Sequence, residues 1–221
     1  MIIHLRAFIF DLDGTLLYTL EDIADAMNLA LLELHLQPYQ LEEYRWLVGG
    51  GAENIALKAL PEFLHSEQNI NDFVASFRTH YRLNWHAKTR PYSGIPELIG
   101  YLRAKHYPLA VLSNKPQEFT YQIVQHFFHH SQTVFNPVWG QREDFTVKPD
   151  PATALAIADF WKLAPEQVGF IGDSDVDMET ALKAGMTALG AGWGFRGEAE
   201  LIASGAQIML RHPLELIKYV E

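Results

Sequence analysis

Short runs of apolar residues alternate over most of the chain with longer segments in which apolar residues recur every three or four positions. The short runs are typical of strands buried on both faces, and the longer segments are typical of amphipathic helices. Strands are predicted at Arg6–Asp13, Pro108–Ser113, Val134–Val138, Val168–Gly172, Met186–Gly190 and Ala206–Leu210. Helices are predicted at Gly94–Lys105, Pro116–His130, Pro151–Lys162, Val176–Ala184 and Gly197–Ser204. This alternation predicts an α/β fold with a parallel sheet covered by helices on both faces.

The alternation is interrupted after the first strand, where the apolar pattern between about residues 20 and 87 is helical throughout. Four helices are predicted there, at Leu20–Leu36, Leu41–Val48, Ala52–Leu60 and Ile70–Ala87. The last of them carries aromatic residues at helical spacing, which are predicted to form the core of this segment: Phe73, Phe77, Tyr81 and Trp85. We therefore predict an α/β core, residues 1–16 and 89–221, into which a helical domain, residues 17–88, is inserted.

Two acidic residues directly follow the first predicted strand, in the sequence Asp11–Thr15 (DLDGT). Ligand sites of open α/β sheets lie beyond the carboxyl ends of the strands, so Asp11 and Asp13 are expected to point into such a site. Two carboxylates at one buried strand end are costly unless a cation neutralises them. Gly14 permits a tight turn, and Thr15 offers a hydroxyl and an N–H group to an anion. The alternative is a strand that merely ends in a polar turn.

A second strand end, Gly172–Asp177 (GDSDVD), is also acidic. Asp173 follows the predicted strand, and Asp177 lies near the start of the next helix. Oxygen ligands from separate strand ends suit Mg²⁺, which keeps several waters and accepts one or two carboxylates. Taken alone, Asp173 fits a helix N-cap and Asp177 a first-turn acid. Beside Asp11 and Asp13, the same residues favour a metal site.

Two further segments offer groups that bind anions. Ser113 and Asn114 end a predicted strand just before a helix, which is an anion-binding geometry, although both residues are also common in turns. Lys148 precedes Pro149 and a predicted helix start. This places Lys148 at a loop–helix junction, whereas the usual position of a lysine is on the solvated surface.

Composition narrows the classes of protein in which these residues can act. The 221 residues carry a net charge of −10, which argues against a general nucleic-acid binder, because such proteins neutralise phosphates with a basic face. No apolar run is long enough to predict a membrane span, and the apolar start predicts a strand and not a secretory signal. Without cysteine there is no disulfide framework, thiolate metal site or cysteine nucleophile. The expected compartment is the cytoplasm.

Two other patterns in the sequence are predicted to have structural roles. The glycine-rich segment Gly190–Gly197 is predicted to be a loop near the site and not a nucleotide-binding loop, because no ribose-binding acid follows it in the same unit. His126, His129 and His130 have the helical spacing of metal ligands, but the sequence shows no third ligand beside them. They are predicted to lie on one face of an amphipathic helix.

The four motifs together resemble, in their order and spacing, the signature set of the haloacid dehalogenase superfamily. The set comprises DLDGT from Asp11, then Ser113 with Asn114, then Lys148, then GDSDVD ending at Asp177. The resemblance covers nearly the whole chain and implies a Rossmann-like α/β core. It also implies that the helical insert is a cap domain, because one subclass of the superfamily carries its cap between the first two motifs.

The resemblance also implies a role for each matching residue. Asp11 is similar to the nucleophile that becomes an aspartyl-phosphate, and Asp13 to the general acid that protonates the leaving oxygen and then activates water. Mg²⁺ would be held by Asp11, by the main-chain carbonyl of Asp13 and by Asp173. Asp177 would orient a metal-bound water or Lys148. The phosphoryl oxygens would be bound by Thr15, Ser113, Asn114 and Lys148.

Other residues suggest the branch of the superfamily. Asp13 favours a phosphatase or phosphomutase, because dehalogenases lack a carboxylate there. The segments Leu16–Ile23 and Val48–Ala52 look most like phosphoglycolate phosphatases. This implies a Mg²⁺-dependent phosphatase that acts on a small phosphorylated metabolite. Tyr18 departs from the pattern, which usually has Asp, so cap closure and fine specificity stay open.

Arg45 and the loop Gly49–Gly51 are candidates to contact the organic leaving group, because a cation and exposed N–H groups can meet an acidic or polar group. The alternative for Arg45 is a solvated helix residue.

Three other functions are alternatives to a phosphatase. One is a β-phosphoglucomutase-like phosphomutase, and another is a pyrophosphatase or nucleotidase that shares much of the pattern. The third is a non-catalytic interaction protein on a decayed scaffold, which is disfavoured because Asp11, Asp13, Lys148 and Asp173 are all present. The expected partner is a small phosphorylated metabolite, with no nucleic acid or membrane, in a monomer or homodimer. The sequence does not identify the substrate.

Overall fold

The computed structural model describes residues 4–128 and 134–220. The chain divides into two compact units. The core unit comprises Met1–Leu17 and Pro91–Glu221, and the helical unit comprises Tyr18–Arg90. The sequence prediction had placed the two boundaries after residues 16 and 88. His129 and His130, from the histidine pattern, lie outside the described residues.

The core unit is built on a 6-stranded sheet in which all neighbouring strands run parallel. In spatial order the strands are β5 (Val138–Gln141), β4 (Leu109–Pro116), β1 (Ala7–Phe10), β6 (Val168–Gly172), β7 (Thr187–Ala191) and β8 (Ile208–Leu210). The chain leaves β1 toward β4 and β5 on one side and later returns to β6, β7 and β8 on the other. β1 therefore lies where the strand order reverses, which is where open α/β sheets bind ligands.

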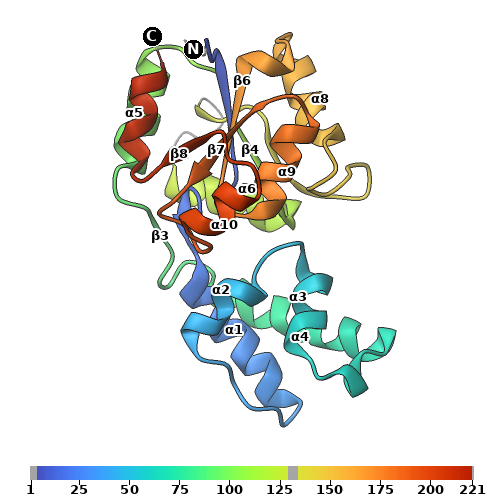
Figure 1. Cartoon of the computed structure of the whole chain (residues 1–221). Coiled ribbons are helices and arrows are strands. Elements are labelled where there is room, and N and C mark those ends of the chain that lie inside the picture. The colour runs from blue at the N-terminus through green and yellow to red at the C-terminus, as the bar shows by residue number, and fades with distance from the viewer. Residues whose placement is uncertain (1–3, 129–133, 221) are drawn as a thin grey trace. The chain divides into compact units, whose positions relative to one another are not determined.

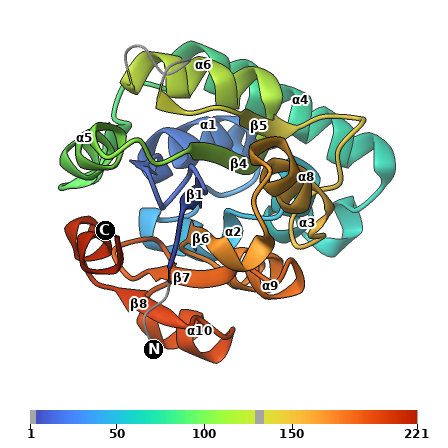
Figure 2. The same cartoon turned by 90° about the horizontal axis from the view of Figure 1, so that it is seen from above.

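Helices cover both faces of this sheet (Figures 1 and 2). They are α5 (Ile95–Ala104), α6 (Gln117–Phe127), α8 (Ala152–Trp161), α9 (Asp175–Lys183) and α10 (Glu198–Ala203). Apolar side chains of α8, α9 and α10 pack on one face, among them Ile157, Met178 and Leu201. Strand residues such as Ile9 and Phe170 complete this core. The α/β fold class predicted from the sequence is confirmed.

Two elements of the core unit differ from the prediction. The strand predicted at Val134–Val138 begins only at Val138, because the backbone is helical at Val134 and bends at Phe135 and Asn136. The helix predicted to reach His130 ends at Phe127, and His130 lies outside the described residues. A C-terminal 3₁₀ helix, Pro213–Tyr219, was not predicted.

The helical unit contains α1 (Leu20–Glu33), α2 (Tyr44–Leu47), α3 (Ala52–Ala59), α4 (Glu67–Asn84) and two short 3₁₀ helices, Leu41–Glu43 and Glu62–Leu64. The α1 and α4 helices pack against each other. The aromatic residues predicted to form the core of this segment are all buried: Phe73, Phe77, Tyr81 and Trp85. Across the described residues, no helix combines the length and apolarity needed to cross a membrane.

A short sheet formed by β2 (Leu17–Tyr18) and β3 (Arg90–Pro91) contains both points at which the chain passes between units. Next to it, within the helical unit, the buried carboxylate of Asp22 accepts three kinds of hydrogen bond. The N–H of Lys88 donates at 3.0 Å, and the N–H and hydroxyl of Thr89 donate at 2.8 and 2.7 Å. Asp22 therefore ties the start of α1 to the segment that leaves the helical unit.

Replacing Asp22 with alanine should destabilise the protein by about 3 kcal/mol, because buried N–H and O–H donors would lose their acceptor. Urea denaturation would measure the loss. Asp25→Ala is a matched control, because Asp25 is 53% exposed and pairs with an equally exposed Lys88 ammonium. That control should change stability by less than about 1 kcal/mol. Equal effects of the two substitutions would contradict the structural role of Asp22.

Candidate active site

The candidate site lies at the carboxyl ends of the central strands of the core unit. Asp11 directly follows β1, and its N–H donates to the carbonyl of Ile171 on β6 at 2.9 Å. Asp173 directly follows β6, while Ser113 lies on β4 on the other side of β1. The parallel order β4-β1-β6 thus brings together residues that lie far apart in the sequence.

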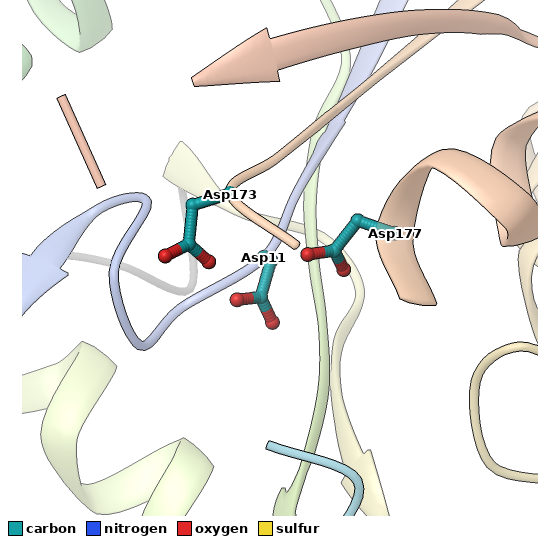
Figure 3. Close-up of side chains that lie close together, drawn as sticks. All are labelled: Asp11, Asp173 and Asp177. Carbon is teal, nitrogen blue, oxygen red and sulfur yellow. The ribbon is translucent and has the colours of Figure 1, made fainter. Parts of the chain in front are cut away.

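Three carboxylates converge at this point (Figure 3). Asp11, Asp173 and Asp177 each offer an oxygen, and these atoms all lie within 4.8 Å of one another. The residues come from three segments, namely the ends of β1 and β6 and the first turn of α9. All three are buried, with 6%, 3% and 1% exposure, so their charges are poorly solvated.

Lys148 is buried against two of these carboxylates. Its Nζ donates to Oδ1 of Asp11 at 2.7 Å and to Oδ1 of Asp177 at 2.6 Å. Asn114 fixes the main chain of Lys148, because its Oδ1 accepts from the Lys148 N–H and its Nδ2 donates to the Lys148 carbonyl, both at 2.8 Å. The side chain of Asn114, predicted to bind phosphate, therefore positions Lys148 and keeps only one amide N–H for another acceptor.

The electrostatics of the cluster show a shortage of positive charge. Burial, assisted by the charge of Asp177, raises the pKa of Asp11 to about 7 against the lowering effect of Lys148. Burial and the charges of Asp177 and Asp11 hold the pKa of Asp173 well above its ordinary value. Burial lowers the pKa of Lys148, but the charges of Asp11 and Asp177 raise it overall.

The donor set fits a divalent metal ion. Among the described residues no lysine or arginine pairs with Asp173, whose Oδ2 accepts a hydrogen bond from the N–H of Phe195 at 2.7 Å. With Asp13 included, the site has four carboxylates and two ammonium groups, those of Lys115 and Lys148. If all are ionised, they leave a formal charge of minus two. A buried set of oxygen ligands with this charge suits Mg²⁺.

The side chain of Asp13 is not part of the three-carboxylate cluster. Both of its oxygens accept from Nζ of Lys115, at 3.0 and 2.9 Å. The sequence interpretation did not single out Lys115, although strand alternation places it on the same side of β4 as Ser113. That alternation was the available signal.

Thr15 and Ser113, predicted to bind phosphate, lie at the same end of the sheet. The hydroxyl of Thr15 is buried and has no hydrogen-bond partner among the described residues. The Ser113 hydroxyl accepts from the N–H of Lys115 at 3.3 Å, which leaves its own proton available to an acceptor. Their role toward phosphate stays a prediction, as does that of Arg45, which is exposed on α2 of the helical unit.

The glycine-rich loop supports the site, in agreement with its predicted structural role. The Nε1 of Trp193 donates to the Thr15 carbonyl at 2.9 Å, and the next residues pack on Asp173. A Cβ atom at Gly14 or Gly194 would collide with Asp173, so both glycines are required for this close approach. Gly14 also has a positive φ of 88°, which other residues rarely adopt.

Comparison with known proteins places this geometry in a family. The sequence profile described as haloacid dehalogenase-like hydrolase matches residues 8–191. The chain belongs to this family. The predicted resemblance and the predicted enzyme class, a phosphatase of the haloacid dehalogenase type, are confirmed at this level.

Three relatives illustrate the similarity. A phosphoglycolate phosphatase of Aquifex aeolicus is 31% identical over 98% of this chain and 97% of its own. An N-acetylmuramic acid 6-phosphate phosphatase of Pseudomonas aeruginosa is also 31% identical, over 99% and 96%. A crystal structure from Haemophilus somnus 129pt, described as a predicted phosphoglycolate phosphatase, superposes with a TM-score of 0.89 at 26% identity over 97% of both chains.

Proposed function

We propose that this hydrolase is a Mg²⁺-dependent phosphatase that transfers the phosphoryl group of a small, acidic phosphomonoester to Asp11 and then to water. The observation that carries the proposal is the buried cluster in which Lys148 binds both Asp11 and Asp177 beside Asp173, which no described lysine or arginine neutralises. Such a cluster can accept a metal ion and a phosphate dianion together. A site without a free carboxylate nucleophile could not form an acyl phosphate.

In the first step an Asp11 oxygen attacks phosphorus while the bond from phosphorus to the leaving oxygen breaks. Asp13 gives a proton to that oxygen, and the product leaves as an alcohol. In the second step water attacks phosphorus, its proton passes to Asp13, and the bond to Asp11 breaks. Inorganic phosphate leaves and both aspartates return to their initial states.

The remaining groups bind the metal ion, orient Lys148 or stabilise the phosphoryl oxygens. Asp11, Asp173 and the main-chain carbonyl of Asp13 would hold the ion. When bound, Mg²⁺ offsets the repulsion between the carboxylates and the phosphate. Asp177 is engaged by Lys148 through Oδ1 and by the Ser174 hydroxyl through Oδ2, so it is suited to orient Lys148. The Ser113 and Lys148 donors would stabilise the phosphoryl oxygens.

The substrate class is inferred from the relatives and from chemistry. Two relatives that are equally similar to this chain have names that contain phosphoglycolate and N-acetylmuramic acid 6-phosphate. These two compounds differ greatly in size. Both carry a carboxylate on the leaving group. We therefore expect an acidic phosphomonoester, with phosphoglycolate first because several relatives bear that name.

A phosphate-release screen tests the proposal. It would compare 2-phosphoglycolate, N-acetylmuramate 6-phosphate, β-glucose 1-phosphate, pyrophosphate and nucleoside monophosphates at equal concentration with Mg²⁺. Release from a carboxylate-bearing ester at the highest kcat/KM would support it. Conversion of β-glucose 1-phosphate to glucose 6-phosphate without phosphate release would indicate the phosphomutase instead. Preference for pyrophosphate or nucleotides would indicate the pyrophosphatase or nucleotidase instead.

The helical unit is proposed to act as the cap that selects the substrate. In the Gly49–Gly51 loop all three glycines have positive φ, so the loop conformation depends on glycine. Asn54 anchors the loop through a 3.0 Å hydrogen bond from Nδ2 to the Gly49 carbonyl. Arg45 is exposed on α2 and forms no ion pair with any of the described residues. An anionic leaving group could therefore recruit it without breaking an existing pair.

Arg45→Gln should change the ranking of substrates more than the overall chemistry. We expect about a ten-fold or greater loss of kcat/KM for 2-phosphoglycolate and a change within about two-fold for p-nitrophenyl phosphate, which lacks a carboxylate. Arg78→Gln, at another exposed arginine of the helical unit, is the matched control. Equal losses for every substrate would assign specificity to other residues.

The same proposal includes the cellular compartment, the oligomeric state and the partners of the enzyme. We expect it to act in the cytoplasm on a small diffusible metabolite, as a monomer or homodimer, without nucleic acid or membrane partners. The net charge of −10 argues against a nucleic-acid partner, because no excess of basic groups is available to neutralise a polyanion.

A further inference from the structure

Lys115 forms the most enclosed ion pair of the site that the proposed steps do not use. Its Nζ reaches both oxygens of Asp13, at 3.0 and 2.9 Å, and the two side chains are only 8% and 15% exposed. A lysine ammonium has three donor hydrogens, and two of them can serve this carboxylate at once. The pair joins the carboxyl end of β4 to the turn that follows β1.

The main chain of Lys115 is fixed on both sides of the residue. Its N–H donates to the Ser113 hydroxyl at 3.3 Å, and its carbonyl accepts from the Thr120 hydroxyl at 3.0 Å. A Cβ atom at Gly140 on β5 would collide with that carbonyl, so β5 lies in close contact with it. The side chain therefore extends to Asp13 from a rigid base.

The two lysines of the site serve different aspartates. Lys148 binds Asp11 and Asp177, while Lys115 binds Asp13. Among the described side chains, that of Lys115 is the only one that forms a hydrogen bond with the Asp13 carboxylate. Without Lys115, Asp13 would lose the contact that selects its orientation.

We propose that Lys115 is a positioning residue that holds the Asp13 carboxylate in the orientation from which it accepts a proton from the attacking water. This inference rests on the proposed function, in which the water gives its proton to Asp13 as the bond between phosphorus and Asp11 breaks. A carboxylate held at both oxygens by one ammonium keeps its other lone pairs directed away from the lysine, where a water can meet them. Lys115 should therefore matter most in the second step.

The experiment isolates that step with p-nitrophenyl phosphate, whose leaving group needs no proton from Asp13. Acid-quenched enzyme is analysed by intact mass spectrometry, which gives the fraction that carries a phosphoryl group during steady turnover. Dividing kcat by this fraction gives the rate constant of dephosphorylation. For Lys115→Met this constant should fall about ten-fold or more, while the phosphorylated fraction rises.

Further variants show whether the loss of the Lys115 cation is the cause of slower dephosphorylation. Lys115→Arg keeps a cation for Asp13 and should restore the dephosphorylation constant to within about three-fold. Lys115→Gln removes the charge but keeps a polar side chain, and it replaces Lys115→Met if that variant does not fold. Lys105→Met, at an exposed lysine of the core unit, should match wild type. Asp13→Asn should accumulate the phosphorylated form even more strongly.

The possible outcomes distinguish the positioning role of Lys115 from the proposed aspartyl-phosphate route. If Asp13→Asn accumulates phosphorylated enzyme and Lys115→Met does not, Lys115 does not position Asp13. A higher KM or a slower first step in Lys115→Met, with unchanged dephosphorylation, would make Lys115 a direct phosphate ligand and overturn the inference. If neither variant nor wild type carries a phosphoryl group while wild type hydrolyses the ester, the aspartyl-phosphate route itself is wrong.

Discussion

Asp11→Asn should reduce phosphate release at least about a thousand-fold while the protein remains folded. Asparagine has nearly the same shape, but its amide cannot form the acyl phosphate that the proposed route requires. Lys148 would keep its 2.6 Å bond to Asp177, so its position does not depend on Asp11 alone. Removing one charge also relieves repulsion within the three buried carboxylates.

Asp175→Asn is the matched control, because Asp175 begins the same helix as Asp177 but is exposed to solvent. That variant should retain wild-type turnover. Circular dichroism and urea denaturation would show that both variants are folded. Phosphate release near the wild-type rate from folded Asp11→Asn would exclude Asp11 as the nucleophile.

The sequence predicted the parallel sheet and the acidic strand ends because both follow from local patterns. A buried apolar run that ends in Asp11 or Asp173 places the carboxylate at one edge of the sheet, whatever the remaining packing. The first residue of β5 was missed for a local reason as well, since apolar character suggested Val134 while the backbone there is helical and bends through Asn136.

The partners of the polar side chains could not be predicted in the same way. Asn114 pairs with the main chain of Lys148, 34 residues away, and Lys115 pairs with Asp13, 102 residues away. Turn and surface preferences, on which the sequence interpretation rested, describe a residue and its neighbours only. The Lys115–Asp13 pair forms because β1 and β4 are adjacent, and the Asn114–Lys148 pair forms because the segment after β5 meets the end of β4. Both therefore became visible only once the strand order was known.

Removal of divalent metal should abolish activity, and Mg²⁺ should restore it. Treatment with EDTA followed by exchange into metal-free buffer should lower phosphate release at least about a hundred-fold. Ca²⁺ should compete with Mg²⁺ without restoring turnover, because it prefers more ligands and looser geometry and would not hold the phosphate in line. Full activity in thoroughly chelated protein would contradict a metal-dependent mechanism.

A second measurement detects the ion without turnover. Mg²⁺ would bind the folded protein and relieve the repulsion among its buried carboxylates, so at about 100 times its Kd it should raise Tm by about 5 °C or more. Asp173→Asn removes the carboxylate that has no cationic partner in the described structure, and this variant should lose the shift. Asp175→Asn should keep it, because that side chain lies outside the cluster and is exposed. An undiminished shift in Asp173→Asn would place the ion elsewhere, even if activity still required Mg²⁺.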